Sequence, residues 1–148
     1  MIPPVVLFHY GSFDPLMQHP GLVQAGPSME ASVGIQVPRP SIPLLRQLLG
    51  SNGLPRQGVL LHFTDPFLLR SSPLRGLRQW NGPRLMACGD LHHGPAPIET
   101  LAAYLQQEPH DAVLLTFNPA WLDEVQQRLS LPVHSCPTSF FDTQRPSV

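Results

Sequence analysis

One short stretch of the sequence combines residue types from which acid–base chemistry is built. Asp90 is followed by His92 and His93, so one carboxylate and two imidazoles fall within four residues. A neutral histidine can act as a general base near neutral pH, and a neighbouring carboxylate can fix its orientation. A turn does not need two adjacent imidazoles, so this spacing predicts a catalytic role for Asp90, His92 and His93.

The elements around this stretch predict how it is positioned. It lies between an apolar strand expected over 84–88 and an amphipathic helix that begins at Pro97. The other expected strands cover 5–9, 59–63, 111–117 and 131–134, and the other expected helices cover 41–50 and 119–129. Alternating strands and helices of this kind predict an α/β protein. We expect a single Rossmann-like three-layer domain with a mostly parallel sheet of about five strands.

Polar residues follow several of these strands. Because parallel strands end at one edge of a sheet, and ligands bind there, the polar residues are candidates for one site. Strand-to-helix turns also favour such residues as caps, which is the structural alternative. The predicted substrate-binding residues are Tyr10, Ser12, Asp65 and Asn118.

Two segments lack a regular pattern. Residues 20–40 are rich in Gly, Pro and Ser and predict an irregular loop, and residues 138–148 predict a loose tail. The 148 residues correspond to about one domain, so we expect residues 1–148 to form a single unit.

The composition excludes several classes of function. All nine basic residues are arginine, so neither a Walker-type phosphate loop nor a pyridoxal Schiff base can form. The net charge of −1 gives no electrostatic basis for binding nucleic acid. No apolar run approaches a membrane span, and the two cysteines have no metal spacing. We therefore expect a cytoplasmic protein with no cofactor and no bound metal.

The stretch from Pro83 to about Cys136 resembles part of the N-terminal domain of a GT-B type glycosyltransferase of the CgeB-like kind. The resemblance is carried by residues 89–94 after a strand, by Pro97 at the helix start, and by residues 108–115, with Asn118 after them. It implies sugar transfer from a nucleotide-sugar donor to an acceptor, with this domain on the acceptor side. It also implies that His92 or His93 deprotonates the acceptor hydroxyl while Asp90 orients the imidazole.

The donor-binding domain of such an enzyme is not found in these 148 residues. We therefore expect the isolated chain to be inactive and to bind nucleotide-sugar and acceptor only together with a donor-domain protein. Two alternatives stay open. Gly89, Asp90 and His92 look like the first motif of a metal-dependent phosphoesterase, although its later motifs are missing. The chain could instead be a non-catalytic Rossmann-like binding module.

Overall fold

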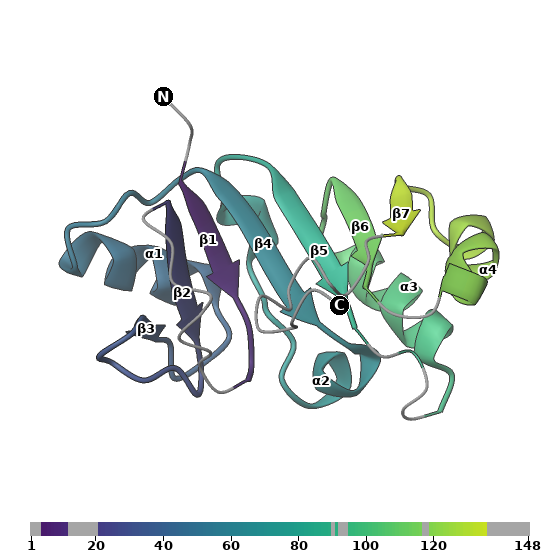
Figure 1. Cartoon of the computed structure of the whole chain (residues 1–148), viewed down its shortest axis with the longest axis horizontal. Coiled ribbons are helices and arrows are strands. Elements are labelled where there is room, and N and C mark those ends of the chain that lie inside the picture. The colour runs from purple at the N-terminus through teal and green to yellow at the C-terminus, as the bar shows by residue number, and fades with distance from the viewer. Residues whose placement is uncertain (1–3, 12–20, 90, 92–94, 117–118, 136–148) are drawn as a thin grey trace, which may run out of the picture.

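The computed structural model describes residues 4–11, 21–89, 91, 95–116 and 119–135 of the chain. These residues form one open, all-parallel sheet of seven strands in the order β3-β2-β1-β4-β5-β6-β7 (Figure 1). The strands are β1 Val5–Phe8, β2 Leu22–Gly26, β3 Ile35–Gln36, β4 Val59–Thr64, β5 Arg84–Cys88, β6 Ala112–Leu115 and β7 Val133–Ser135. The α/β class and the parallel sheet predicted from the sequence are thus confirmed.

The helices among the described residues occupy the connections after β3. The α-helices are α1 Ile42–Ser51, α2 Pro66–Ser71, α3 Pro97–Gln107 and α4 Leu122–Arg128, and the short 3-10 helices are η2 Leu77–Gln79 and η3 Pro119–Trp121. The sequence predicts α1 and the start of α3 at Pro97, whereas it does not predict α2. Ser41 caps α1 through its side chain, and Asp65 caps α2 in the same way. Proline stands in the first turn of α1, α2 and α3, where its missing N–H costs no hydrogen bond.

The sheet has seven strands rather than about five, and the two additional strands lie in the segment predicted as an irregular loop. Leu22 pairs with Val5, and the register continues to Ala25 opposite Phe8. Hydrogen bonding to β1 stabilises this short segment even though its sequence lacks a clean alternation of polar and apolar residues. At the end of β2, the backbone of His9 approaches Gly26 closely. Glycine is required there because a Cβ would collide with the carbonyl oxygen of His9.

All the described α-helices pack against one face of the sheet. The side chains of Val6, Leu60, Met86 and Val113 point to this face, and each lies under helix residues in a buried cluster. A right-handed crossover places its helix on one face when the chain moves toward β7 and on the other when it moves toward β3. The connection from β2 to β3 contains only turns, and the described part of the β1–β2 connection holds no helix. The described residues therefore form two layers, the sheet and the helices on one of its faces, and the third layer of the predicted domain is not among them.

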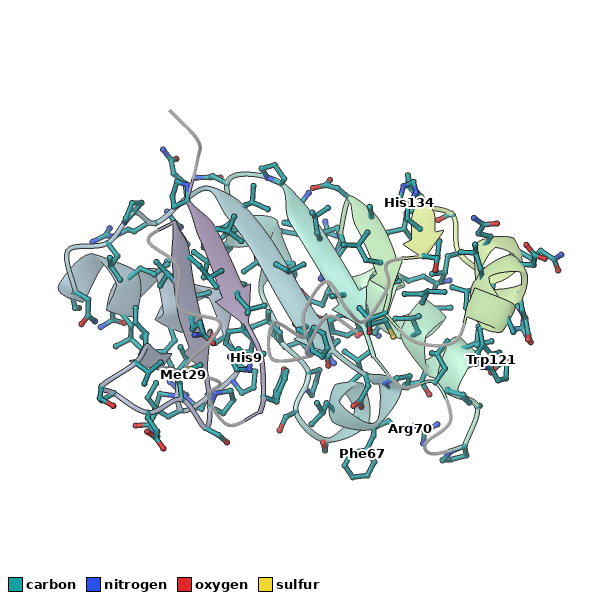
Figure 2. All side chains as sticks on the ribbon, viewed as in Figure 1. His9, Met29, Phe67, Arg70, Trp121 and His134 are labelled. Carbon is teal, nitrogen blue, oxygen red and sulfur yellow. The ribbon has the colours of Figure 1, made fainter. Side chains whose placement is uncertain are left out.

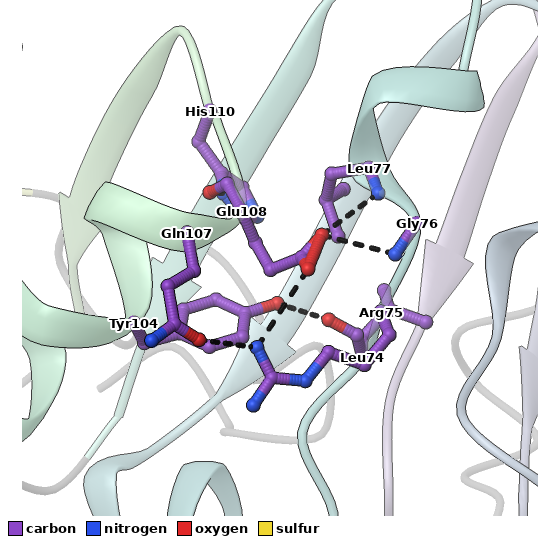
Figure 3. Close-up of polar contacts among 8 residues, drawn as sticks. All are labelled: Leu74, Arg75, Gly76, Leu77, Tyr104, Gln107, Glu108 and His110. Atoms are coloured by element: carbon purple, nitrogen blue, oxygen red, sulfur yellow. Dashed lines mark hydrogen bonds and ion pairs between the residues drawn. The ribbon is translucent and has the colours of Figure 1, made fainter.

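The helix layer contains two apolar clusters, one under α1 and one under α3 and α4. A mostly irregular segment, residues 72–77, runs through this layer from the end of α2 to Leu77, the first residue of η2. Its backbone groups are held by side chains from elsewhere, as buried polar groups require (Figure 3). The Tyr104 hydroxyl donates to the Leu74 carbonyl at 2.6 Å, and Glu108 Oε1 accepts from the Gly76 and Leu77 N–H groups at 2.9 and 3.1 Å. Among the described residues, no helix is long and apolar enough to cross a membrane.

Candidate functional site

A pocket lies at the carboxyl ends of β1 and β4, which we call the switch-point pocket. The order of strands reverses between these two neighbours, since β2 and β3 continue to one side of β1 and β5 to β7 to the other side of β4. Open α/β sheets bind ligands at such reversals because the connections leave a crevice there. The cavity has a volume of about 270 Å³ and is lined by His9, Tyr10, Gly11, Phe63, Thr64, Asp65 and Leu68.

Asp65 forms one wall of the pocket and also starts α2. Its Oδ1 accepts a hydrogen bond from the Leu68 N–H at 2.9 Å, which satisfies one of the free donors at the helix start. Its second oxygen, Oδ2, makes no hydrogen bond within the part of the chain that the structure describes. The residue is therefore both a helix cap and a source of negative charge for the pocket.

Tyr10 contributes its ring to the pocket, while its hydroxyl serves the fold. The hydroxyl donates to the Ser72 carbonyl at 2.6 Å, and the ring packs edge-on against Phe8 with centroids 5.5 Å apart. Burial raises the pKa of the Tyr10 hydroxyl above its ordinary value, so the group stays neutral. Tyr10 can therefore offer a ligand an aromatic surface rather than a free hydroxyl.

His9 lines the pocket at the end of β1, next to β2 (Figure 2). Its Nε2 lies 2.9 Å from Oε1 of Gln24, a residue of β2 whose side chain is buried. Burial lowers the pKa of His9, and the contact with Gln24 opposes this shift only in part. His9 is therefore neutral at pH 7. Sequence reasoning missed it because the expected strand 5–9 included it, whereas β1 ends at Phe8.

Two of the predicted site residues, Tyr10 and Asp65, come together in this pocket from different parts of the sequence. Ser12, Asp90, His92, His93 and Asn118 lie outside the described residues. Gly89, the residue before Asp90, is described, and its N–H donates to the Thr64 carbonyl at 2.8 Å. The chain thus leaves β5 directly beside a pocket-lining residue.

A pair of buried histidines lies behind Tyr10. His62 of β4 is fully buried, its ring centroid is 6.4 Å from that of Tyr10, and its Nδ1 is 3.2 Å from Nε2 of His110. Nδ1 of His110 lies 2.9 Å from the Glu108 carbonyl oxygen, which can only accept. His110 therefore carries its proton on Nδ1, and His62 donates through its own Nδ1. Nε2 of His62 is then a buried acceptor without a partner in the described structure.

The described residues contain no group of three or more His, Cys, Asp or Glu side chains that could hold a metal ion. Comparison with known proteins gave no match to a family model, to a curated protein or to a solved structure. The chemistry of the switch-point pocket therefore follows from its lining residues alone. They supply the Asp65 carboxylate, the neutral His9 imidazole, the Thr64 hydroxyl and apolar walls. Such a pocket can bind a small molecule with several hydrogen-bond donors.

Proposed function

We propose that this chain is the acceptor-side domain of a GT-B type glycosyltransferase pair and that its acceptor binds in the switch-point pocket. One observation carries the proposal, namely that the pocket lies where the strand order reverses, between the carboxyl ends of β1 and β4. The order of the first six strands, 3-2-1-4-5-6, is that of Rossmann-like ligand-binding domains. The shape and chemistry of the pocket suit a small polar substrate.

The segment that resembles the glycosyltransferase domain supports the same conclusion. Residues 83–136 include β5, β6 and β7, which continue the sheet beyond β4 on one side of the pocket, together with α3 and α4. Cys88 at the end of β5 is in register with Thr64 at the end of β4. The stretch that begins at Asp90 therefore starts from the strand next to the pocket wall.

The proposed reaction needs one proton transfer on this side. The acceptor oxygen attacks the anomeric carbon, the bond from that carbon to the nucleoside diphosphate breaks, and the acceptor proton passes to His92 or His93. Asp90 orients the imidazole and stabilises its protonated form. The nucleotide-sugar is bound by a donor-domain protein, because the pocket has no cationic lining residue in the described part of the chain.

The test is a transfer assay with and without a donor domain. The chain is co-expressed with each protein encoded beside its gene, and the purified complex is incubated with a radiolabelled nucleotide-sugar and an extract of candidate acceptors. We expect labelled product only from a complex with a nucleotide-binding partner, and loss of product in the His92→Ala/His93→Ala variant. Transfer by the chain alone would contradict the need for a partner, and metal-dependent phosphoester cleavage in place of transfer would contradict the proposal.

A further inference from the structure

We propose that the switch-point pocket selects an uncharged polyhydroxy ligand and that Nδ1 of His9 accepts a hydrogen bond from one of its hydroxyl groups. The inference rests on the site of the proposed function, and it adds the chemical class of the ligand and a recognition residue. It does not depend on sugar transfer.

The contact with Gln24 decides which nitrogen of His9 faces a ligand as an acceptor. Oε1 of Gln24 is an amide oxygen and can only accept, so Nε2 of His9, 2.9 Å away, must carry the proton. A neutral imidazole has one proton, which leaves Nδ1 with a free lone pair. Because Gln24 is only 3% exposed, water does not compete well for this contact, and the tautomer is fixed.

Nδ1 lies on the pocket side of the His9 ring. The neighbouring pocket residue Gly11 is so placed that a Cβ on it would be 3.8 Å from Nδ1. Nδ1 has no hydrogen-bond partner in residues 4–11, 21–89, 91, 95–116 and 119–135. The backbone that carries the ring is held by β2, since the His9 N–H donates to the Ala25 carbonyl at 3.0 Å. Within the described part of the chain, this acceptor is therefore preorganised and has no competing donor.

The rest of the pocket favours the same ligand class. Asp65 brings a carboxylate whose Oδ2 has no hydrogen-bond partner among the described residues, and this carboxylate accepts hydrogen bonds and repels anions. Arg70 is the arginine closest in sequence to Asp65. Its guanidinium donates hydrogen bonds to Thr100 Oγ1 at 3.1 Å and to the Pro95 carbonyl at 2.8 Å. The lining also contains apolar surface from Phe63 and Leu68. Two acceptors facing apolar walls match a molecule with hydroxyl donors and C–H faces, such as a pyranose, and do not match a phosphate.

The experiment is an NMR titration of the full ¹⁵N-labelled chain with methyl α-D-glucopyranoside, its galacto and manno isomers, and inorganic phosphate. We expect amide shifts of His9, Gly11, Thr64 and Asp65 with at least one glycoside and none with phosphate. His9→Leu should weaken glycoside binding about tenfold, whereas His9→Asn, which keeps an acceptor oxygen near the position of Nδ1, should recover part of it. The ¹⁵N shifts of the His9 ring should show Nε2 protonated and Nδ1 unprotonated.

Two further variants keep the test interpretable. Gly11→Ala places a methyl group beside Nδ1 on an exposed residue, and it should weaken binding even if His9→Leu fails to fold. His134→Leu is the matched control, since His134 is exposed on β7, at the far edge of the sheet (Figure 2).

Four results would overturn the inference, namely no binding of any of the three glycosides, phosphate binding in the pocket, equal affinity of the His9→Leu variant, or a protonated Nδ1. Loss of glycoside binding with transfer intact in the complex would reject this inference alone. Glycoside binding without transfer would reject the proposed function alone.

Discussion

Acidification should destabilise this protein through its buried histidine pair. His62 is fully buried and His110 is 8% exposed, and their rings stack with centroids 5.4 Å apart. Burial lowers the pKa of His110 to about 4, and burial together with the neighbouring His110 lowers the pKa of His62 well below its ordinary value. Both rings are therefore neutral in the folded protein at pH 7.

The sign and size of the effect follow from proton linkage. Below pH 6.5 the unfolded chain binds protons that the folded protein does not, so the free energy of unfolding falls as the pH falls. With a folded pKa of about 4 and an unfolded pKa of about 6.5, His110 alone removes about 2 kcal/mol between pH 7 and pH 5. His62 acts in the same direction. A loss of this size is a large fraction of the roughly 5–15 kcal/mol that stabilises a typical domain.

Urea unfolding at pH 7, 6 and 5 measures this loss, with the fluorescence of the buried Trp80 as the signal. The His62→Leu/His110→Leu variant should lose most of the pH dependence over this range, whatever its stability at pH 7. His134→Leu should keep the pH dependence of the parent protein. An equal free energy of unfolding at pH 7 and pH 5, or an unchanged slope in the double variant, would refute the reasoning.

Three further predictions concern single contacts. Tyr104→Phe removes the donor to the buried Leu74 carbonyl and should cost about 1–3 kcal/mol in urea unfolding, and a change below about 0.5 kcal/mol would contradict this role. Gly26→Ala drives a methyl group into the His9 carbonyl oxygen and should lower the melting temperature in calorimetry, which an unchanged melting temperature would disprove. The Cys88 thiol is buried, so in a Cys136→Ser background it should react with Ellman's reagent only after unfolding, and rapid reaction of the native protein would contradict this burial.

The sequence predicts the half of the sheet whose strands alternate with helices. Val59–Thr64 and Arg84–Cys88 are compact apolar runs that form strands as predicted, and the helix predicted after the second of them begins at Pro97. Leu22–Gly26 could not be predicted because its stability comes from pairing with β1, which lies outside any local pattern.

The candidate site is predicted in part for a similar reason. Asp65 and Tyr10 could be found because polar residues at the carboxyl ends of parallel strands converge on one edge. The role of His9 could not be predicted because it depends on a side-chain contact with Gln24, 15 positions along the chain. Gln24 belongs to β2, a strand that the sequence does not predict. The signal that could have identified His9 is its position at the end of a strand, immediately before the Tyr-Gly turn.

The segment 72–77 has a consequence for how this protein can vary. Its carbonyl and N–H groups receive the hydrogen bonds from Tyr10, Tyr104 and Glu108, and Glu108 also forms an ion pair with the Arg75 side chain. Natural or engineered exchanges at Ser72 are therefore compatible with these contacts, whereas Tyr10, Tyr104 and Glu108 are constrained in identity. Insertion or deletion of one residue would shift every backbone group away from its partner. An apparent loop, where length changes are usually harmless, is thus a place where the number of residues is fixed.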